Sequence, residues 1–162
     1  MTSNVPTVRQ INWISIVPQI AIIGLLIYLY NLVNFGDPFI LGSLMYLILA
    51  FGLRNIIPKD HRKAIKLVKQ QKFAEAIPYF EKSYDYFMKY SWVDKYRFLT
   101  ILSSSRMCYR EMALCNIAFC YGQIGEGQKA KEYYQQTLTE YPENGMAQAG
   151  INMLNLVDNK LA

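Results

Sequence analysis

An uncharged stretch of 23 residues, from Ile11 to Val33, constrains this chain more than any other feature. Thirteen of its residues are Leu, Ile or Val. A helix rises about 1.5 Å per residue, so the stretch reaches roughly 35 Å and exceeds the bilayer's hydrocarbon thickness of about 30 Å. The alternative, a buried core helix, would need a large soluble core that the remaining residues are too few to build. We therefore expect a membrane-spanning helix with a local kink near Pro18.

A second apolar run, from Phe39 to Leu53, has 15 residues and is short for a span on its own. Extended through Ile57 it reaches about 30 Å, with the Arg54 side chain directed to the interface. Residues 34–38 between the runs are rich in turn-forming types, so the two helices must be antiparallel. A re-entrant or interfacial second helix remains an alternative. The prediction is a transmembrane hairpin over 1–56, with spans at about 11–33 and 39–56.

Charge is distributed unevenly along the chain. Residues 1–56 hold only Arg9, Asp37 and Arg54 as charged groups, whereas 57–162 hold 15 Lys/Arg and 11 Asp/Glu. Positive residues flanking a span stay on the cytoplasmic side. Arg9 before the first run and the basic residues after the second therefore predict an integral membrane protein. Both termini and the domain after the hairpin are expected on the cytoplasmic side, or on its equivalent in an organelle.

The segment directly after the hairpin is basic. Residues 58–72 hold six Lys/Arg and one acidic residue. Near a membrane each such cation gains about 1 kcal/mol from anionic lipid head groups. Alternatively, these side chains only set the topology and solvate a helix, and both roles can hold together. Nucleic acid is not an expected partner, because the excess charge of 57–162 is only 15 minus 11. The candidates for contact with the membrane surface are Lys59, Arg62, Lys63 and Lys66.

Residues 111–144 carry a pattern typical of a helix–turn–helix. Small and aromatic residues recur at helical spacing, Gly125 falls where a helix must stop, and Pro142 ends the pattern. The residues that carry it are Leu114, Ile117, Ala118, Tyr121, Ala130, Tyr134 and Thr137. This pattern resembles the tetratricopeptide repeat (TPR), a helix–turn–helix of 34 residues. The alternative is an unrelated helical bundle with accidental spacing.

A looser copy precedes it, carried by Ala64, Leu67, Ala76 and Phe80, 54 residues earlier in the chain. The extra residues between the copies contain Ser91-Trp-Val-Asp94, which predicts the start of a short inserted helix. Asn144 is a candidate N-cap for a last helix. The resemblance implies an all-α fold for 57–162, a small TPR-like array. Its expected parts are repeats at about 57–90 and 111–144, an insert at 91–110 and a capping helix at 145–160.

No catalytic constellation is visible. His61 is the only histidine, and a solvated residue at a helix start explains it more simply than a catalytic base. Cys108, Cys115 and Cys120 lack the spacing of metal ligands, so we expect them to pack within helices. The sequence therefore predicts no enzyme, no cofactor and no metal site.

The family resemblance implies a groove that binds other proteins and is lined by the first helix of each repeat. Chaperone-binding members hold a C-terminal carboxylate with a clamp of lysines and asparagines. Asn116 matches one clamp asparagine, but the other clamp places lack the required residues; they hold His61, Ile65, Met146 and Gly150. A helix or an extended apolar segment is therefore the better ligand. The partner-binding residues expected from helical spacing are His61, Ile65, Lys69, Met112, Asn116, Phe119 and Gln123, with Cys115 beside them.

The preferred hypothesis is a membrane-anchored TPR scaffold that recruits or assembles a protein complex at the cytoplasmic face. The alternative is an accessory or assembly subunit of a larger integral membrane complex, bound mainly through the hairpin. A groove of so few repeats binds weakly by itself. Confinement in the membrane, or self-association into a homo-oligomer, would raise the effective concentration and compensate.

Overall fold

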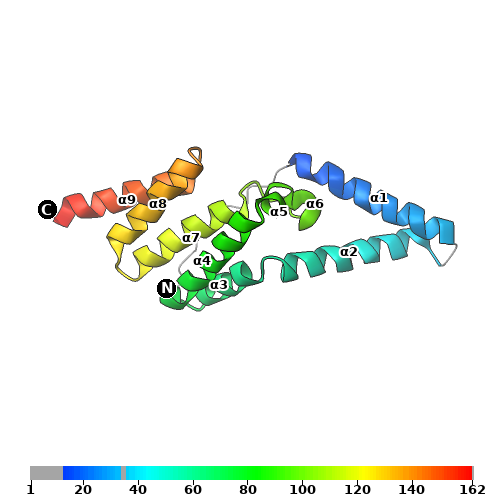
Figure 1. The fold of residues 1–162 in the computed structure, drawn as a ribbon, viewed down its shortest axis with the longest axis horizontal. Coiled ribbons are helices and arrows are strands. Elements are labelled where there is room, and N and C mark those ends of the chain that lie inside the picture. The colour runs from blue at the N-terminus through cyan, green and yellow to red at the C-terminus, as the bar shows by residue number, and fades with distance from the viewer. Residues whose placement is uncertain (1–12, 34–35, 162) are drawn as a thin grey trace. The chain divides into compact units, whose positions relative to one another are not determined.

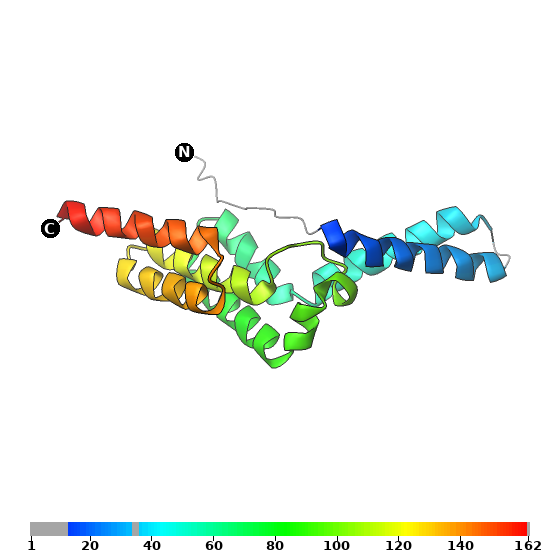
Figure 2. The ribbon, with the colours of Figure 1, turned by 90° about the horizontal axis from the view of Figure 1, so that it is seen from above.

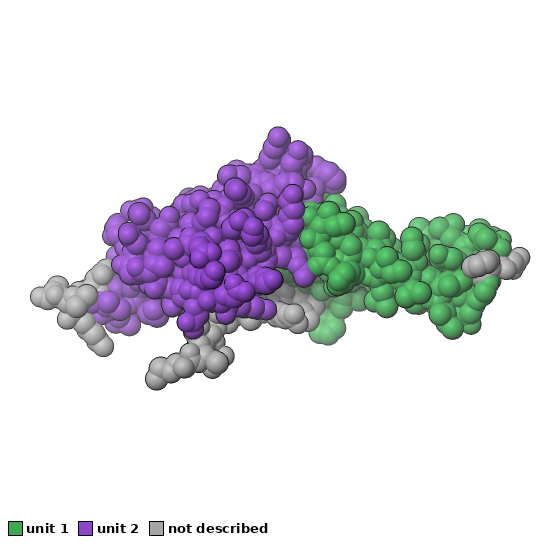
Figure 3. All heavy atoms as spheres, turned by 90° about the horizontal axis from the view of Figure 1, so that it is seen from below, with its two compact units in different colours: residues 1–57, 95–108 green, residues 58–94, 109–162 purple. Residues whose placement is uncertain are grey.

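The computed structural model describes residues 13–33 and 36–161 and is helical, with no strand in these ranges (Figure 1). The expected all-α fold is confirmed. The chain forms two compact units, which Figure 3 colours separately. Unit 1 comprises Met1–Ile57 with Lys95–Cys108, and unit 2 comprises Pro58–Asp94 with Tyr109–Ala162. Arg9, used above to predict the orientation, lies outside the described residues.

Unit 1 is built on a helical hairpin. After a short 3-10 turn, η1 (Trp13–Ser15), come α1 (Ile16–Val33) and α2 (Pro38–Ile56), which pack along each other (Figure 2). The side chain of Asp37 begins α2 by accepting hydrogen bonds from the backbone N–H groups of Phe39, at 2.9 Å, and Ile40, at 3.2 Å. This is an N-cap, and Pro38 at the first helical position suits it because proline lacks the N–H that would be unpaired there.

The two helices approach closely at Gly42. A Cβ atom placed there would lie 2.9 Å from both the Cα and the backbone nitrogen of Ile27. Small residues permit this kind of backbone contact between apolar helices. Gly24 and Gly52, in contrast, have nothing within 4 Å of the position of a Cβ. Gly42 is therefore the glycine on which the hairpin packing depends.

The hairpin leaves its apolar surface uncovered within the described chain. No residue of α1 is buried there, and only Gly42 and Ala50 of α2 are. Seven large apolar or aromatic side chains of α1 and nine of α2 are exposed. A core helix of a soluble domain would be mostly buried. At 18 and 19 residues, about 27 and 29 Å, both helices are long and apolar enough to cross a membrane.

Part of the predicted insert belongs to unit 1. After α5 (Ser91–Lys95) and α6 (Arg97–Thr100), the chain continues as a loop in which Ile101 and Leu102 are buried. The backbone oxygen of Leu102 accepts hydrogen bonds from Gln19 Nε2, at 3.2 Å, and from Arg54 Nε, at 3.1 Å, and a further one from the Arg54 guanidinium. The insert at 91–110 was predicted to lie within the repeat domain, whereas its part from Lys95 to Cys108 belongs to unit 1 with the hairpin.

Unit 2 is a stack of helices in which each packs against the next along the chain (Figures 1 and 2). Two short turns, at residues 70–72 and 124–126, reverse the chain within the helix pairs. Gly125 occupies the second turn with φ +84°, a conformation that favours glycine. The helices are α3 (Lys59–Lys69), α4 (Phe73–Lys89), α7 (Tyr109–Gln123), α8 (Gly127–Glu140) and α9 (Gly145–Leu161).

Small residues lie where these helices meet, as the spacing predicts. The side chains of Ala64, Ala76, Ala118, Ala130 and Thr137 are all fully buried. An alanine or threonine at such a place lets two helix backbones come close without leaving a void. The burial of these positions is confirmed.

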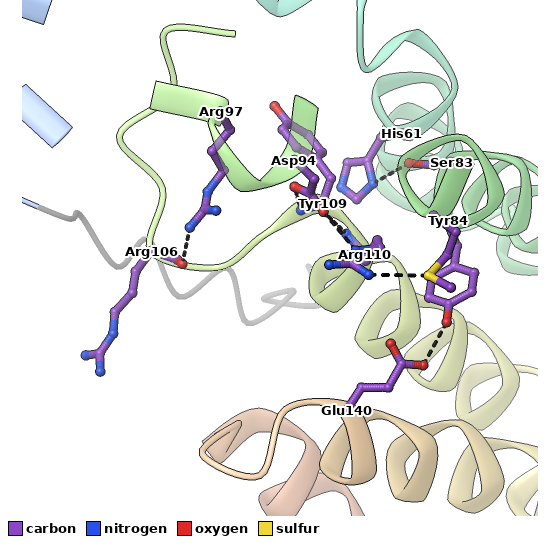
Figure 4. Close-up of polar contacts among 10 residues, drawn as sticks. His61, Ser83, Tyr84, Asp94, Arg97, Arg106, Tyr109, Arg110 and Glu140 are labelled. Carbon is purple, nitrogen blue, oxygen red and sulfur yellow. Dashed lines mark hydrogen bonds and ion pairs between the residues drawn. The ribbon is translucent and has the colours of Figure 1, made fainter. Parts of the chain in front are cut away.

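Two polar caps complete the stack. Asn144 Oδ1 accepts a hydrogen bond from the backbone N–H of Ala147, at 2.8 Å, which confirms the predicted cap of α9. Asp94 is fully buried, and its carboxylate accepts from the backbone N–H groups of Tyr109, at 2.7 Å, and Arg110, at 3.1 Å (Figure 4). A side chain predicted to help start its own short helix therefore caps α7, 15 residues further along the chain.

The close approach at Gly42 predicts the effect of a substitution. Gly42→Val should destabilise the hairpin by about 1–3 kcal/mol, because the new methyl groups would meet the backbone of Ile27. The helical circular dichroism of the full chain in mild detergent, titrated with sodium dodecyl sulfate, measures this loss. Gly52→Val, on the same helix in open space, is the matched control and should unfold like the wild type. Equal shifts in the two variants would contradict the packing described here.

Candidate functional site

Helix α7 lies at the centre of unit 2 and contacts α3, α4, α8 and α9. These neighbours leave several side chains of α7 at least partly accessible, and four of them form a strip. Met112, Asn116 and Phe119 are half-buried and Gln123 is exposed, and their spacing of four, three and four residues places them on one helix face. Cys115 was expected beside them but is buried, because it points to the packed side of the helix. The residues of that packed side are Ala113, Leu114, Cys115, Ile117, Ala118 and Cys120.

Phe119 has two roles in this strip. Its ring stands edge-on to the ring of Phe73, with the centroids 5.9 Å apart. Phe73 is the first residue of α4, so this contact ties the start of α4 to α7. Phe119 is half-buried, so only part of its side chain contributes an apolar surface at the middle of the strip.

The three candidates on α3 have different surroundings. Lys69 is exposed and Ile65 is half-buried, whereas His61 is only 6% exposed. The expectation that His61 is a solvated residue is therefore wrong. His61 shares one helix face with Ala64 and Val68, three and seven residues on, and this face packs into the core of unit 2.

Aromatic rings surround His61. Its ring stands edge-on to the rings of Phe80 and Tyr109, both with centroids 5.3 Å away, and Tyr109 in turn stacks on Phe87. The Nδ1 atom of His61 lies 3.3 Å from the hydroxyl of Ser83 (Figure 4). This cluster joins α3, α4 and α7. Because a buried ring presents little surface to another protein, we leave His61 out of the binding face proposed below.

Burial also decides the charge of His61. Removal from water penalises the charged ring and lowers the pKa of His61 from 6.5 to about 4. The ring is therefore neutral near pH 7, where it shares a hydrogen bond with Ser83. This is the environment of a structural histidine in a core.

Cys115 and Cys120 pack within α7, as expected, whereas Cys108 lies in the loop just before this helix. Cys115 and Cys120 are buried and Cys108 is half-buried. Burial raises the pKa of Cys120 to about 12, so its thiol stays protonated and unreactive near neutral pH. Within 13–33 and 36–161, no group of three or more His, Cys, Asp or Glu side chains is placed to hold a metal ion.

The basic residues at the start of α3 are accessible. Lys59, Arg62, Lys63 and Lys66 are all exposed, and Lys63 Nζ lies 4.2 Å from the centre of the Tyr79 ring. Helix α3 begins three residues after the end of α2. Their contact with lipid head groups stays a prediction.

Sequence reasoning missed a polar network in unit 1. The hydroxyl of Tyr46 donates a hydrogen bond to Gln19 Oε1, at 3.3 Å, while Gln19 Nε2 and Arg54 donate to the Leu102 oxygen. Gln19 is one of the few polar residues in the uncharged run from Ile11 to Val33. A polar residue in an apolar run usually has a hydrogen-bond partner, so the presence of Gln19 predicts that a partner exists. The sequence does not indicate that the partner is the loop containing Leu102.

Comparison of this chain with family models, with curated proteins and with solved structures finds no match. The resemblance to the tetratricopeptide repeat therefore rests on the residue pattern and on the order of the helices, and it stays a prediction.

The buried ring of His61 predicts a pH dependence. Between pH 6.5 and about 4 the unfolded chain binds a proton that the folded chain does not, so the free energy of unfolding falls as the pH falls through this window. At pH 4.5 the loss relative to pH 7 should reach about 2–3 kcal/mol from this group. Denaturant titration of the full chain in detergent at the two pH values measures it.

His61→Gln is the comparison, because glutamine does not titrate but can still bond to Ser83. The variant should lose less stability than the wild type on acidification, by the amount given above. Identical losses in the two proteins would show that folding does not lower the pKa of His61.

Proposed function

We propose that this chain is a membrane-anchored protein-binding module. In this proposal the hairpin of α1 and α2 holds the chain in a bilayer, and the helical stack of unit 2 offers a surface to another protein on the cytoplasmic side. The observation that carries the proposal is the uncovered apolar surface of the hairpin, next in sequence to a helical stack that buries a core of its own.

The energetics of insertion support the anchor. Helix α1 contains eleven Leu, Ile and Val residues, each of which favours insertion by about 0.3–0.6 kcal/mol. Their total of about 3–7 kcal/mol outweighs the penalty of the uncharged polar residues Gln19 and Asn31. Arg54 lies in the last turn of α2, where its long side chain can reach the water.

The sidedness follows from charge. The turn between the two helices holds Asp37, whereas the segment after α2 holds the exposed Lys59, Arg62, Lys63 and Lys66. The positive-inside rule places that segment, and with it unit 2, in the cytoplasm or its organellar equivalent. Only a few residues separate Lys59 from α2, which keeps these cations within reach of anionic head groups.

The proposed binding face consists of the α7 strip, Met112, Asn116, Phe119 and Gln123, with Ile65 and Lys69 of α3. It combines a methionine and an aromatic ring with two amides, chemistry that suits a helix or an extended apolar segment. Methionine adapts to different apolar surfaces, and the amides supply hydrogen bonds. We infer a TPR-like scaffold whose weak intrinsic affinity is raised by confinement in the membrane.

The alternative is an accessory subunit of a larger integral complex. One observation favours it: Gly24 of α1 and Gly52 of α2 face open space, so another apolar helix could approach the hairpin closely at either place. In that case the hairpin, rather than the α7 strip, would make the main contact with the partner.

Variants of the full chain test the binding face. Phe119→Glu should reduce recovery of the cross-linked partner from native membranes by about tenfold, because a carboxylate would replace an apolar anchor. Gln123→Lys, at an exposed position of the same strip, should weaken capture without touching the contact between Phe119 and Phe73. The control is Ile124→Glu, which like Phe119→Glu puts a carboxylate in place of an apolar side chain, but at an exposed residue outside the strip. This control should capture the partner like the wild type. Partner recovery by quantitative mass spectrometry and helix content by circular dichroism are the measurements.

The same experiment separates the two candidate functions. Full recovery with Phe119→Glu and Gln123→Lys, together with loss of recovery in Gly24→Leu, would contradict the binding face and favour the accessory subunit. Loss of helix content in Phe119→Glu alone would assign that residue to the core and leave Gln123→Lys as the deciding variant.

A further inference from the structure

The segment Lys95–Thr100 in unit 1 has an accessible apolar side that the proposed binding face does not use. Tyr96 is 44% exposed and Leu99 is 47% exposed. The residues that follow, Ile101 and Leu102, are buried. The segment is therefore apolar and uncovered at Tyr96 and Leu99 in the described chain, while the residues directly after it are packed within unit 1.

Hydrogen bonds fix where along the hairpin this segment lies. The Leu102 oxygen is bonded to Gln19, in the first turns of α1, and to Arg54, in the last turn of α2. These two places are at the same end of an antiparallel hairpin. Helix α6 also contacts α1. Residues 95–102 are thus held at the end of the hairpin where α1 begins and α2 ends.

Arg54 indicates the depth of that end. A guanidinium is disfavoured inside the hydrocarbon, and arginines near the ends of spanning helices reach to the head groups. If the hairpin spans the bilayer, the Leu102 oxygen that Arg54 binds lies at the boundary between hydrocarbon and water. Helix α6 ends two residues before Leu102, so it lies at nearly the same depth.

We propose that the segment Lys95–Thr100 lies in the membrane–water interface, with Tyr96 and Leu99 in contact with lipid. This inference rests on the spanning hairpin of the proposed function. The chemistry fits an interface, where tyrosine is enriched and where cations meet anionic head groups. The Lys95 ammonium lies 5.6 Å from the centre of the Tyr96 ring, and Lys95 and Arg106 are both exposed.

The loop has internal bonds that hold this arrangement. Arg97 Nε donates a hydrogen bond to the backbone oxygen of Ser105, at 3.0 Å, and its guanidinium donates another to that of Arg106, at 2.5 Å (Figure 4). These bonds close the loop between α6 and the end of the insert. Tyr96, just before α6, and Leu99, within it, therefore belong to a closed loop that is tied to both helices of the hairpin.

Tryptophan fluorescence of the full chain in phospholipid vesicles tests the proposal. Trp13 and Trp92, both exposed, are replaced by Phe, and a single Trp is placed by Leu99→Trp or, in a second protein, by Tyr96→Trp. Two nitroxide-labelled lipids act as quenchers, one labelled near the head group and one near the end of the acyl chain. Leu47→Trp, at an exposed position in the middle of α2, is the reference for the bilayer centre.

For both test positions we expect emission shifted to the blue of free N-acetyltryptophanamide, and quenching by the shallow label about twofold stronger than by the deep one. The Leu47→Trp protein should show the reverse order. Suppose that Leu47→Trp is quenched more by the deep label, as expected for a spanning hairpin. The interfacial placement is then wrong if Trp at positions 96 and 99 is quenched by iodide as strongly as N-acetyltryptophanamide, or if it is quenched by neither the lipids nor iodide. Stronger quenching by the deep label at position 99 also overturns it. If Leu47→Trp is not quenched by either lipid, the spanning hairpin itself is refuted.

Discussion

Helices α1 and α2 carry an apolar surface that the described chain does not cover, and this surface determines the environment that the protein requires. Two helices of 18 and 19 residues expose most of their large apolar side chains. In water this surface would drive aggregation, since soluble monomers rarely expose such extensive apolar patches. A bilayer removes the penalty, and the backbone hydrogen bonds within each helix meet the other requirement of a lipid environment. The membrane is therefore the environment that we propose for the hairpin.

Polar groups at the two ends of the hairpin then acquire distinct roles. At the turn, Asp37 caps α2 through backbone N–H groups. At the other end, Gln19 and Arg54 bond to the Leu102 oxygen, which gives each of them a partner and brings residues 95–108 into unit 1. Asp94, the last residue before that segment, belongs to unit 2 and caps α7. The insert between the two predicted repeats thus has structural roles in both units.

Local patterns explain which features could be predicted from the sequence. Helical spacing identified Ala118, Ala130 and Thr137 as packed positions, and the turn at Gly125 and the cap at Asn144 depend only on residues a few positions away. His61 was misjudged because its neighbours in sequence are charged. Its spacing to Ala64 and Val68 places it on the buried face, so the helical spacing predicts its burial better than the charge of its sequence neighbours does.

The features that sequence reasoning missed arise from contacts between distant segments. Leu102 contributes a backbone oxygen, which has the same chemistry in every residue, so no side-chain pattern marks it. Asp94 lies three residues after a serine, and this local capping pattern concealed its role at Tyr109 and Arg110. The candidate binding face was partly predictable: the spacing of the α7 strip follows from the helix, but the burial of Cys115 and the contact of Phe119 with Phe73 depend on how the neighbouring helices pack.

Extraction of native membranes with alkaline carbonate distinguishes a hairpin that spans the bilayer from a chain that is only bound at its surface. This treatment opens vesicles and releases proteins held by charge or by contact with other proteins, whereas proteins with helices across the bilayer stay in the sedimented membrane. We expect the full chain to stay in the pellet and to be released only by detergent. Recovery of the chain in the carbonate supernatant would contradict a hairpin that spans the membrane.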